Sequence, residues 1–360
     1  MNDKKLYIAG MGMITALGPS VATTVAAVRA GKSAYQLSEY ETEEGEPIIM
    51  ARVPNRVFEH IDCEFEEEGN TFNHRHERII RMAIVALREC VSSLSTNEAV
   101  PLIFTTSTLS SEDNGYTPFL PALVSNVKPW INAAITRRIA PGRSAGIEAI
   151  HFAFQYLMNQ PQDYLLVLGV DSFDDESILQ SFGTRILSPG ASDAFAPGEG
   201  ASALLLTKHI ELAHRENGCV IALNPPCISE EEGHIFSDKP YRGEGLDKAF
   251  KGVLRYQSGK NIQKIYSSMN GENYWAKEYG VAYLRNKQKL IDNCSIEHPA
   301  DCYGDLGAAT STILITLAAE HLHKRKKAKK YLVYGSSDFG TRAAVVVEKI
   351  RIDKKLELMI

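Results

Sequence analysis

Residues 6–20 of the chain read LYIAGMGMITALGPS, and this stretch sets the expectation for the fold. Residues 6–9 form a short run rich in β-forming side chains, which meets Gly10 and Gly12. A helical run at 21–30 follows, with Ser20 in the position of an N-cap. The stretch therefore predicts a strand, a glycine turn and a capped helix.

Strand-like and helix-like runs alternate along the rest of the chain. We expect strands at 100–106, 165–170, 201–207, 220–223, 264–268, 331–334 and 343–350, and helices at 74–94, 147–158, 245–254, 273–284 and 309–322. This alternation predicts an α/β fold with buried parallel or mixed sheets. The second part of the chain repeats the plan of the first. We therefore expect an N-terminal half at 1–215 and a C-terminal half at 216–360.

The composition is that of an ordinary globular protein. The 360 residues are enough for a two-lobed fold with a sizeable core. A hydrophobic content of 44% with 23% charged residues excludes a wholly disordered chain. The formal net charge of −5 provides no overall basic field, which argues against a nucleic-acid partner.

The cysteines and the N-terminus indicate the compartment. The six cysteines are scattered without a C-x-x-C pair, and no histidine group has zinc-site spacing. We therefore expect reduced thiols and no metal site. The N-terminus lacks the apolar run of a signal peptide or a membrane span, which predicts a cytoplasmic protein.

Four motifs occur in an order that is typical of one enzyme family. They are AGMGMITALG at 9–18, FAPGEGA at 195–201, RGEGL at 242–246 and LGAA at 306–309. Together they resemble segments of the β-ketoacyl-(acyl-carrier-protein) synthases. The resemblance covers nearly the whole chain. It implies the thiolase-like fold, in which two similar halves form five layers, αβαβα, and which is usually dimeric.

Synthases of this family join acyl chains with a cysteine at a helix N-terminus and two histidines. The helix end lowers the pKa of the cysteine, and its thiolate leaves a thioester readily. The two imidazoles stabilise the enolate oxygen that forms when malonyl loses CO₂. The resemblance implies this chemistry only where these residue types are present, and we expect no cofactor.

The positions that match these three residues hold other side chains. The family pattern C-x-x-G, ended at Gly146, puts its cysteine on Arg143, and a shorter C-x-G spacing puts it on Ser144. The segment that matches the first histidine holds Asn270, and the one that matches the second holds Gly304. A guanidinium is no nucleophile and glycine has no side chain. The resemblance thus implies a degenerate member without the Cys-His-His set.

The first of these segments also has a rival interpretation. GRSAG at 142–146 matches the G-x-S-x-G nucleophile elbow, in which a strained turn presents a serine hydroxyl. Ser144 is then the alternative nucleophile and needs a histidine from later in the chain. His321 and His323 lie beside a lysine run and are expected to be solvated. His298 is the remaining candidate base.

Other notable features have ordinary structural interpretations. Cys302, near the second histidine position, is expected to be a small packed thiol rather than a reactive one. The acidic run 171–176 predicts a strand-end loop with carboxylates at a helix N-terminus. The lysine-rich run 324–330 predicts a solvated helix end.

Without the Cys-His-His set, the sequence favours recognition over catalysis. We expect a non-catalytic protein partner, scaffold or accessory protein that forms a homodimer or a heterodimer. Two partners remain open: an active synthase, with an acyl carrier protein as a further contact, or an effector of a bacterial secretion system. The alternative is an active acyltransferase of fatty-acid or polyketide synthesis that uses Ser144.

Overall fold

A computed structural model describes residues 4–59, 61, 73–92, 94, 99–107, 116–127, 130–139, 142–255 and 257–352. The strands are β1 (Leu6–Thr15), β2 (Gln36–Glu41), β3 (Pro47–Met50), β4 (Val100–Thr105), β5 (Ile131–Ile139), β6 (Tyr164–Ser172), β7 (Glu199–Thr207), β8 (Cys219–Leu223), β9 (Cys227–Glu230), β10 (Ile262–Tyr266), β11 (Leu290–Glu297), β12 (Lys330–Ser336) and β13 (Thr341–Arg351). The helices are α1 (Val21–Arg29), α2 (His74–Val91), α3 (Tyr116–Val127), α4 (Ala145–Leu157), α5 (Glu176–Ser181), α6 (Glu244–Leu254), α7 (Asn273–Asn286), α8 (Ala300–Tyr303) and α9 (Thr310–Lys324).

The two parts of the sheet repeat one strand order. The first part runs β5-β4-β6-β7-β1, and the second runs β11-β10-β12-β13-β8. In each part the first three strands are parallel, and the last two join in antiparallel pairs. The parts meet where β1 pairs with β8, with Leu6 opposite Leu223. The similarity of the two halves that the sequence predicts is therefore confirmed in the topology, while the division at residue 215 stays a prediction.

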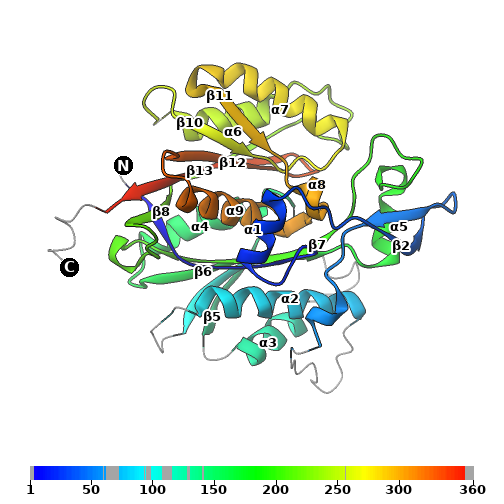
Figure 1. Cartoon of the computed structure of the whole chain (residues 1–360), viewed down its shortest axis with the longest axis horizontal. Helices are drawn as coiled ribbons and strands as arrows, with labels where there is room; N and C mark the ends of the chain where they lie inside the picture. The colour runs from blue at the N-terminus through cyan, green and yellow to red at the C-terminus, as the bar shows by residue number, and fades with distance from the viewer. Residues whose placement is uncertain are drawn as a thin grey trace.

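Helices cover the sheet in layers (Figure 1). Helices α2 and α3 lie on the outer face of the first part, and α6 and α7 lie on the outer face of the second. Between the two parts lie α4 and α9, which contact strands of both. Helix α9 is buried on nearly all sides, as its sequence of apolar and small residues requires. This is the predicted αβαβα arrangement.

The opening strand is longer than the sequence predicts. Residues 6–15 form one strand, and Gly10 and Gly12 lie inside it rather than in a turn. A Cβ at Gly10 would overlap the carbonyl oxygen of Cys90, and one at Gly12 would overlap that of Ala86. The two glycines therefore let the backbone of α2 approach the strand closely. The prediction of a glycine turn was therefore wrong. The predicted helix cap is confirmed, because α1 begins after Ser20 and the Ser20 hydroxyl accepts a hydrogen bond from the Thr23 N–H.

The other expected elements are present with small shifts in their bounds. Strand β11 was missed because it is a polar edge strand, with the sequence LIDNCSIE and few fully buried residues. The β2–β3 hairpin was also missed, and it stands apart from the main sheet. Residues 324–327, at the end of α9, are exposed, as the lysine run predicts. In the described part of the chain, every helix is too short or too polar to cross a lipid bilayer.

Candidate functional site

The three positions that the sequence singled out converge on one carboxylate. Arg143 precedes α4, Asn270 follows β10, and Gly304 lies between α8 and the turn that leads into α9. The Nε of Arg143 and the Nδ2 of Asn270 both donate to Oδ2 of Asp305, at 2.7 and 2.8 Å. Asp305 directly follows Gly304. The structure thus brings the three segments together around a residue that the sequence analysis did not select.

The guanidinium of Arg143 is buried at this centre. Its Nη1 donates to Oδ1 of Asp338 at 2.7 Å and to the Ser336 carbonyl at 3.2 Å. Its Nη2 lies 3.9 Å from Glu272, and its Cζ lies 4.7 Å from the centroid of the Trp275 ring. Burial alone would lower the pKa of Arg143, but the neighbouring carboxylates outweigh burial and raise it. The side chain is therefore a permanent cation that holds the centre closed.

A second arginine completes what we call the arginine cluster: Arg143, Arg185, Glu272, Asp305 and Asp338. Arg185 donates to both oxygens of Glu272, at 2.6 and 3.1 Å, and to Asp338 at 3.2 Å. Asp338 thus bridges the two arginines. Burial would raise the pKa of Asp338, but the two guanidinium groups outweigh it and lower the pKa. Two cations and three carboxylates satisfy one another, with further bonds to Glu272 from Asn270 and Trp275.

Gly304 shapes the backbone at the second histidine position. Its φ of 79° and ψ of −176° lie in a region that only glycine adopts readily. A Cβ at this position would lie 2.8 Å from the Ala196 carbonyl oxygen. This backbone carries the Asp305 side chain to Arg143. The backbone conformation at position 304 therefore does not accommodate a histidine side chain.

The space beside the arginine cluster is nearly filled. A cavity of about 10 Å³ is lined by Asn270, Gly304, Tyr303 and Thr310, among others. This volume is about what one water molecule needs. The Tyr303 and Thr310 hydroxyls are buried without a hydrogen-bond partner among the described residues. An acyl chain would not fit in this cavity.

A larger groove opens on the outer side of the arginine cluster. It has a volume of about 770 Å³, and Arg185 and Glu272 lie on its wall. The rest of the lining includes Glu43, Glu44 and Asp193, all exposed to solvent. The entrance is therefore predominantly acidic.

Ser144 is fully buried at the start of α4. Its Oγ donates to Oε1 of Glu148 at 2.6 Å and lies 2.7 Å from the Oγ of Ser337. Its φ of −82° and ψ of −17° are ordinary helical values, so the strained elbow that the motif predicts is not formed. Burial raises the pKa of Glu148, and its bond with Ser144 lowers it in part.

Close packing accounts for the two glycines of the GRSAG motif. A Cβ at Gly142, where φ is 143°, would overlap the Ser337 hydroxyl. A Cβ at Gly146 would lie 2.9 Å from Thr312 of α9. The candidate base His298 is instead a surface residue, whose Nδ1 lies 2.7 Å from Asp301. The buried Ser144 and the surface residue His298 therefore do not form a serine–histidine pair.

The other candidate residues take structural positions. Cys302 is half-buried against the core, and burial raises the pKa of its thiol, which makes it a poor nucleophile. In the acidic run, Asp175 caps α5 by accepting from the Ile178 N–H at 3.1 Å, as predicted. The prediction for His321 and His323 was wrong: His321 is half-buried and His323 is buried.

Sequence reasoning missed four of the five members of the arginine cluster. Two of them carried a signal, because Glu272 and Asp305 lie within two residues of Asn270 and Gly304. Arg185 lies in a segment without a recognised motif, and Asp338 directly precedes the segment 339–341, FGT, which resembles the last loop of the family, F-G-G-T, with one glycine fewer. Sequence reasoning also missed one group of possible metal ligands in the described residues, His214, Glu216 and His323, whose members are far apart in the chain.

No protein-family model matches the sequence, and no curated protein matches it. Solved structures do match. A chain of the ketosynthase (ApeO) in complex with its chain length factor (ApeC) from Xenorhabdus doucetiae is 16% identical, with a TM-score of 0.71 over 96% of this chain and 98% of that chain. The ketosynthase from module 6 of the bacillaene synthase from Bacillus subtilis is 17% identical, with a TM-score of 0.73 over 96% and 72%.

A beta-ketoacyl synthase from Burkholderia phymatum is 12% identical, with a TM-score of 0.66 over 97% of this chain and 100% of that chain. The likeness spans nearly the whole chain in each case. At these identities it concerns the fold. The chain therefore has the thiolase-like fold of the ketosynthases.

Proposed function

We propose that this chain is a non-catalytic, ketosynthase-like subunit that acts by binding another protein. One observation carries the proposal: the guanidinium of Arg143 fills the centre at which the three motif positions meet. Among the described residues, its partners are carboxylates, a carbonyl and an indole. None of these groups offers a thiolate or an imidazole, which the condensation chemistry requires.

The electrostatics of the groove support the same proposal. An acyl group on a carrier protein or on coenzyme A is presented by an anionic phosphate-bearing arm. The groove that leads to the arginine cluster carries Glu43, Glu44 and Asp193, and Arg185 is held by two carboxylates. Like charges at the entrance disfavour such an arm. The role of an acyl carrier protein as a direct ligand of this groove is therefore not supported.

The surface around β5 supports a partner of the same fold. Strand β5 ends the sheet of the first half, and on its outer side no described strand pairs with it. An unpaired edge is a template for a strand of a second chain. Beside it, a groove of about 510 Å³ is lined by Ile103, Phe152 and Tyr156. The structural neighbours include a ketosynthase in complex with its chain length factor, which favours an active synthase over a secretion effector as partner.

The first experiment tests the loss of catalysis. Wild type and Ser144→Ala are incubated with acetyl, malonyl and hexanoyl thioesters of coenzyme A and of a carrier protein. Intact-protein mass and release of CO₂ are then measured. We expect no adduct and no CO₂ from either protein. A stoichiometric acyl adduct that is lost in Ser144→Ala would overturn the proposal and establish the acyltransferase alternative.

The second experiment tests the partner surface. Tyr156→Glu places a charge in the groove beside β5, and Leu284→Glu places one on α7, where Leu284 is 70% exposed. We expect Tyr156→Glu to abolish dimer formation, with itself or with a coexpressed synthase, in light scattering and native mass spectrometry. Leu284→Glu is the control, and we expect it to leave dimer formation intact. A Tyr156→Glu protein that still pairs would exclude this surface.

A further inference from the structure

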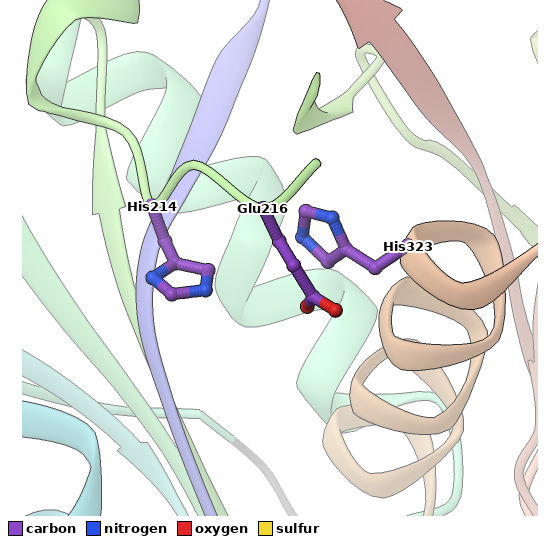
Figure 2. Close-up of side chains that lie close together, drawn as sticks. All are labelled: His214, Glu216 and His323. Atoms are coloured by element: carbon purple, nitrogen blue, oxygen red, sulfur yellow. The ribbon is translucent and has the colours of Figure 1, made fainter. Parts of the chain in front are cut away.

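A second polar group lies at the other end of α9, far from the arginine cluster. His214 and Glu216 belong to the segment between β7 and β8, and His323 belongs to the last turn of α9. Figure 2 shows the Glu216 side chain between the two imidazole rings. One nitrogen of each histidine and a carboxylate oxygen of Glu216 all lie within 4.8 Å of one another.

Local backbone structure directs His214 and Glu216 to the same side. The N–H of His214 donates to the Ile8 carbonyl at 3.0 Å, which fixes the segment against β1. Glu216 then opens a two-residue turn, in which Asn217 and Gly218 have φ values of 53° and 69°. These values belong to the tight hairpin turn that Asn-Gly favours. A ligand atom of His214 and one of Glu216 both lie within 4.8 Å of a ring nitrogen of His323 on α9.

The burial of His323 is the observation that sets this group apart. Its side chain is 6% exposed, and its Nδ1 is buried with no hydrogen-bond partner among the described residues. A buried polar atom without a partner costs free energy, and such atoms are few in folded proteins. The ring of His214 lies nearly perpendicular to that of His323, with centroids 5.7 Å apart. His323 therefore belongs to a possible ligand set while its Nδ1 has no hydrogen-bond partner in the described part of the chain.

The electrostatics favour a cation here. The carbonyl end of α9 carries a partial negative charge, and Glu216 and Glu320 contribute negative potential at His323. Lys349 opposes them, but its ammonium donates to the Arg325 carbonyl. Burial lowers the pKa of His323, with Glu216 and Glu320 acting in the opposite direction.

We propose that His214, Glu216 and His323 bind one divalent transition-metal ion of the zinc class, with water in the remaining position. Two imidazoles and one carboxylate form a known ligand set for Zn²⁺. Bonds of about 2.0–2.1 Å place tetrahedral ligands about 3.4 Å apart, so the ligand atoms, which lie within 4.8 Å of one another, must approach by at most about 1.4 Å. His214 is exposed to solvent. The bound ion fastens the segment between the two halves to the end of α9.

The test uses the full chain, stripped with a chelator and titrated with Zn²⁺, with Co²⁺ as a spectroscopic probe. We expect one ion per chain and a Tm that rises by a few degrees at about 100 times the Kd. The Co²⁺ spectrum should lack the charge-transfer band that a cysteine ligand would add. His214→Gln, on an exposed residue, should weaken Zn²⁺ binding at least about tenfold while leaving the metal-free Tm unchanged.

A matched control lies in the same connecting segment. His209 also faces carboxylates, with Asp163 at 3.2 Å and Glu211 at 3.6 Å, but it is not part of the group. His209→Gln should leave Zn²⁺ affinity unchanged, and His323→Leu should abolish binding. Absence of saturable one-to-one binding would overturn the proposal. So would an affinity that falls in His209→Gln but not in His214→Gln. None of these readouts depends on catalysis or on a protein partner, so this test and those of the proposed function fail independently.

Discussion

The two ends of α9 carry buried polar groups that differ in how completely they are paired. Near its N-terminal end, every charged member of the arginine cluster has a partner of opposite charge. Near its C-terminal end, about 22 Å away along a helix of 15 residues, the Nδ1 of the buried His323 has no hydrogen-bond partner among the described residues. The charged groups of the arginine cluster satisfy one another, whereas the Nδ1 of His323 is available for a further bond.

The largest effect is expected at the paired end. Arg143→Met should destabilise the protein by about 3–5 kcal/mol, because it leaves Asp305 and Asp338 buried with one cation fewer. Urea unfolding followed by circular dichroism measures the change. Lys248→Met is the matched control. It breaks an exposed ion pair with Glu244 and should have little effect. Equal losses in the two variants would contradict a closed, mutually dependent cluster.

A smaller effect is expected from the glycine that turns Asp305 toward Arg143. Gly304→Ala should cost about 1–3 kcal/mol, since its φ is 79° and a Cβ would lie 2.8 Å from the Ala196 carbonyl oxygen. Gly280→Ala is the control, because Gly280 lies inside α7 with open space around it. That change should stabilise the protein by about 0.5–1 kcal/mol. Melting temperatures that move in the same direction would show that the backbone at 304 is not constrained.

The unpaired end should tolerate an apolar replacement. In metal-free protein, His323→Leu should change the free energy of unfolding by less than about 1 kcal/mol, because it removes a buried polar atom that has no hydrogen-bond partner in the part of the chain that the structure describes. Chemical denaturation in the presence of a chelator is the measurement. A loss comparable to that of Arg143→Met would mean that His323 is held by bonds that the structure does not contain.

The two ends should also respond to different pH ranges. Burial is the main cause that lowers the pKa of His323, and it lowers that of His321 to about 4. Unfolded histidine titrates near 6.5. The unfolded chain therefore binds more protons between pH 6.5 and 4, and stability falls as the pH falls through this window. His321→Gln should reduce that slope, measured by unfolding at stepped pH, and an unchanged slope would contradict it.

The arginine cluster should respond only in stronger acid. The pKa of Asp338 is lowered in the folded state, so its contribution is present above the unfolded value of about 3.9 and is lost as the pH falls through the folded one. Arg143→Met should therefore become less destabilising relative to wild type below about pH 4. A difference in the free energy of unfolding between wild type and Arg143→Met that stays constant down to pH 2 would contradict this prediction.

Local sequence patterns predicted most of the fold because hydrophobic spacing and capping act over short distances. Buried runs such as β6 and β7 and the capped α1 follow from their own residues. The glycines of β1 misled the prediction, since their reason is the backbone of α2, some 75 residues away. Polar β11 lacked the apolar run that identifies a strand.

The candidate site was predictable only in part, because its partners come from distant segments. Family motifs located Arg143, Asn270 and Gly304, and the fold brings all three segments together. Nothing local indicates that Arg185 would reach Glu272, 87 residues later. The same limit hid the group at the other end of α9, where His323 lies more than 100 residues after His214 and looks like part of a solvated lysine run.

The stacking of Arg143 on Trp275 provides the protein with an intrinsic optical probe. The chain has two tryptophans, and Trp275 is 2% exposed, donates to Glu272 at 2.8 Å and lies under two guanidinium groups. Its fluorescence therefore reports the environment of the arginine cluster. In a Trp130→Phe background, emission and quenching of this single indole follow opening of the arginine cluster in real time.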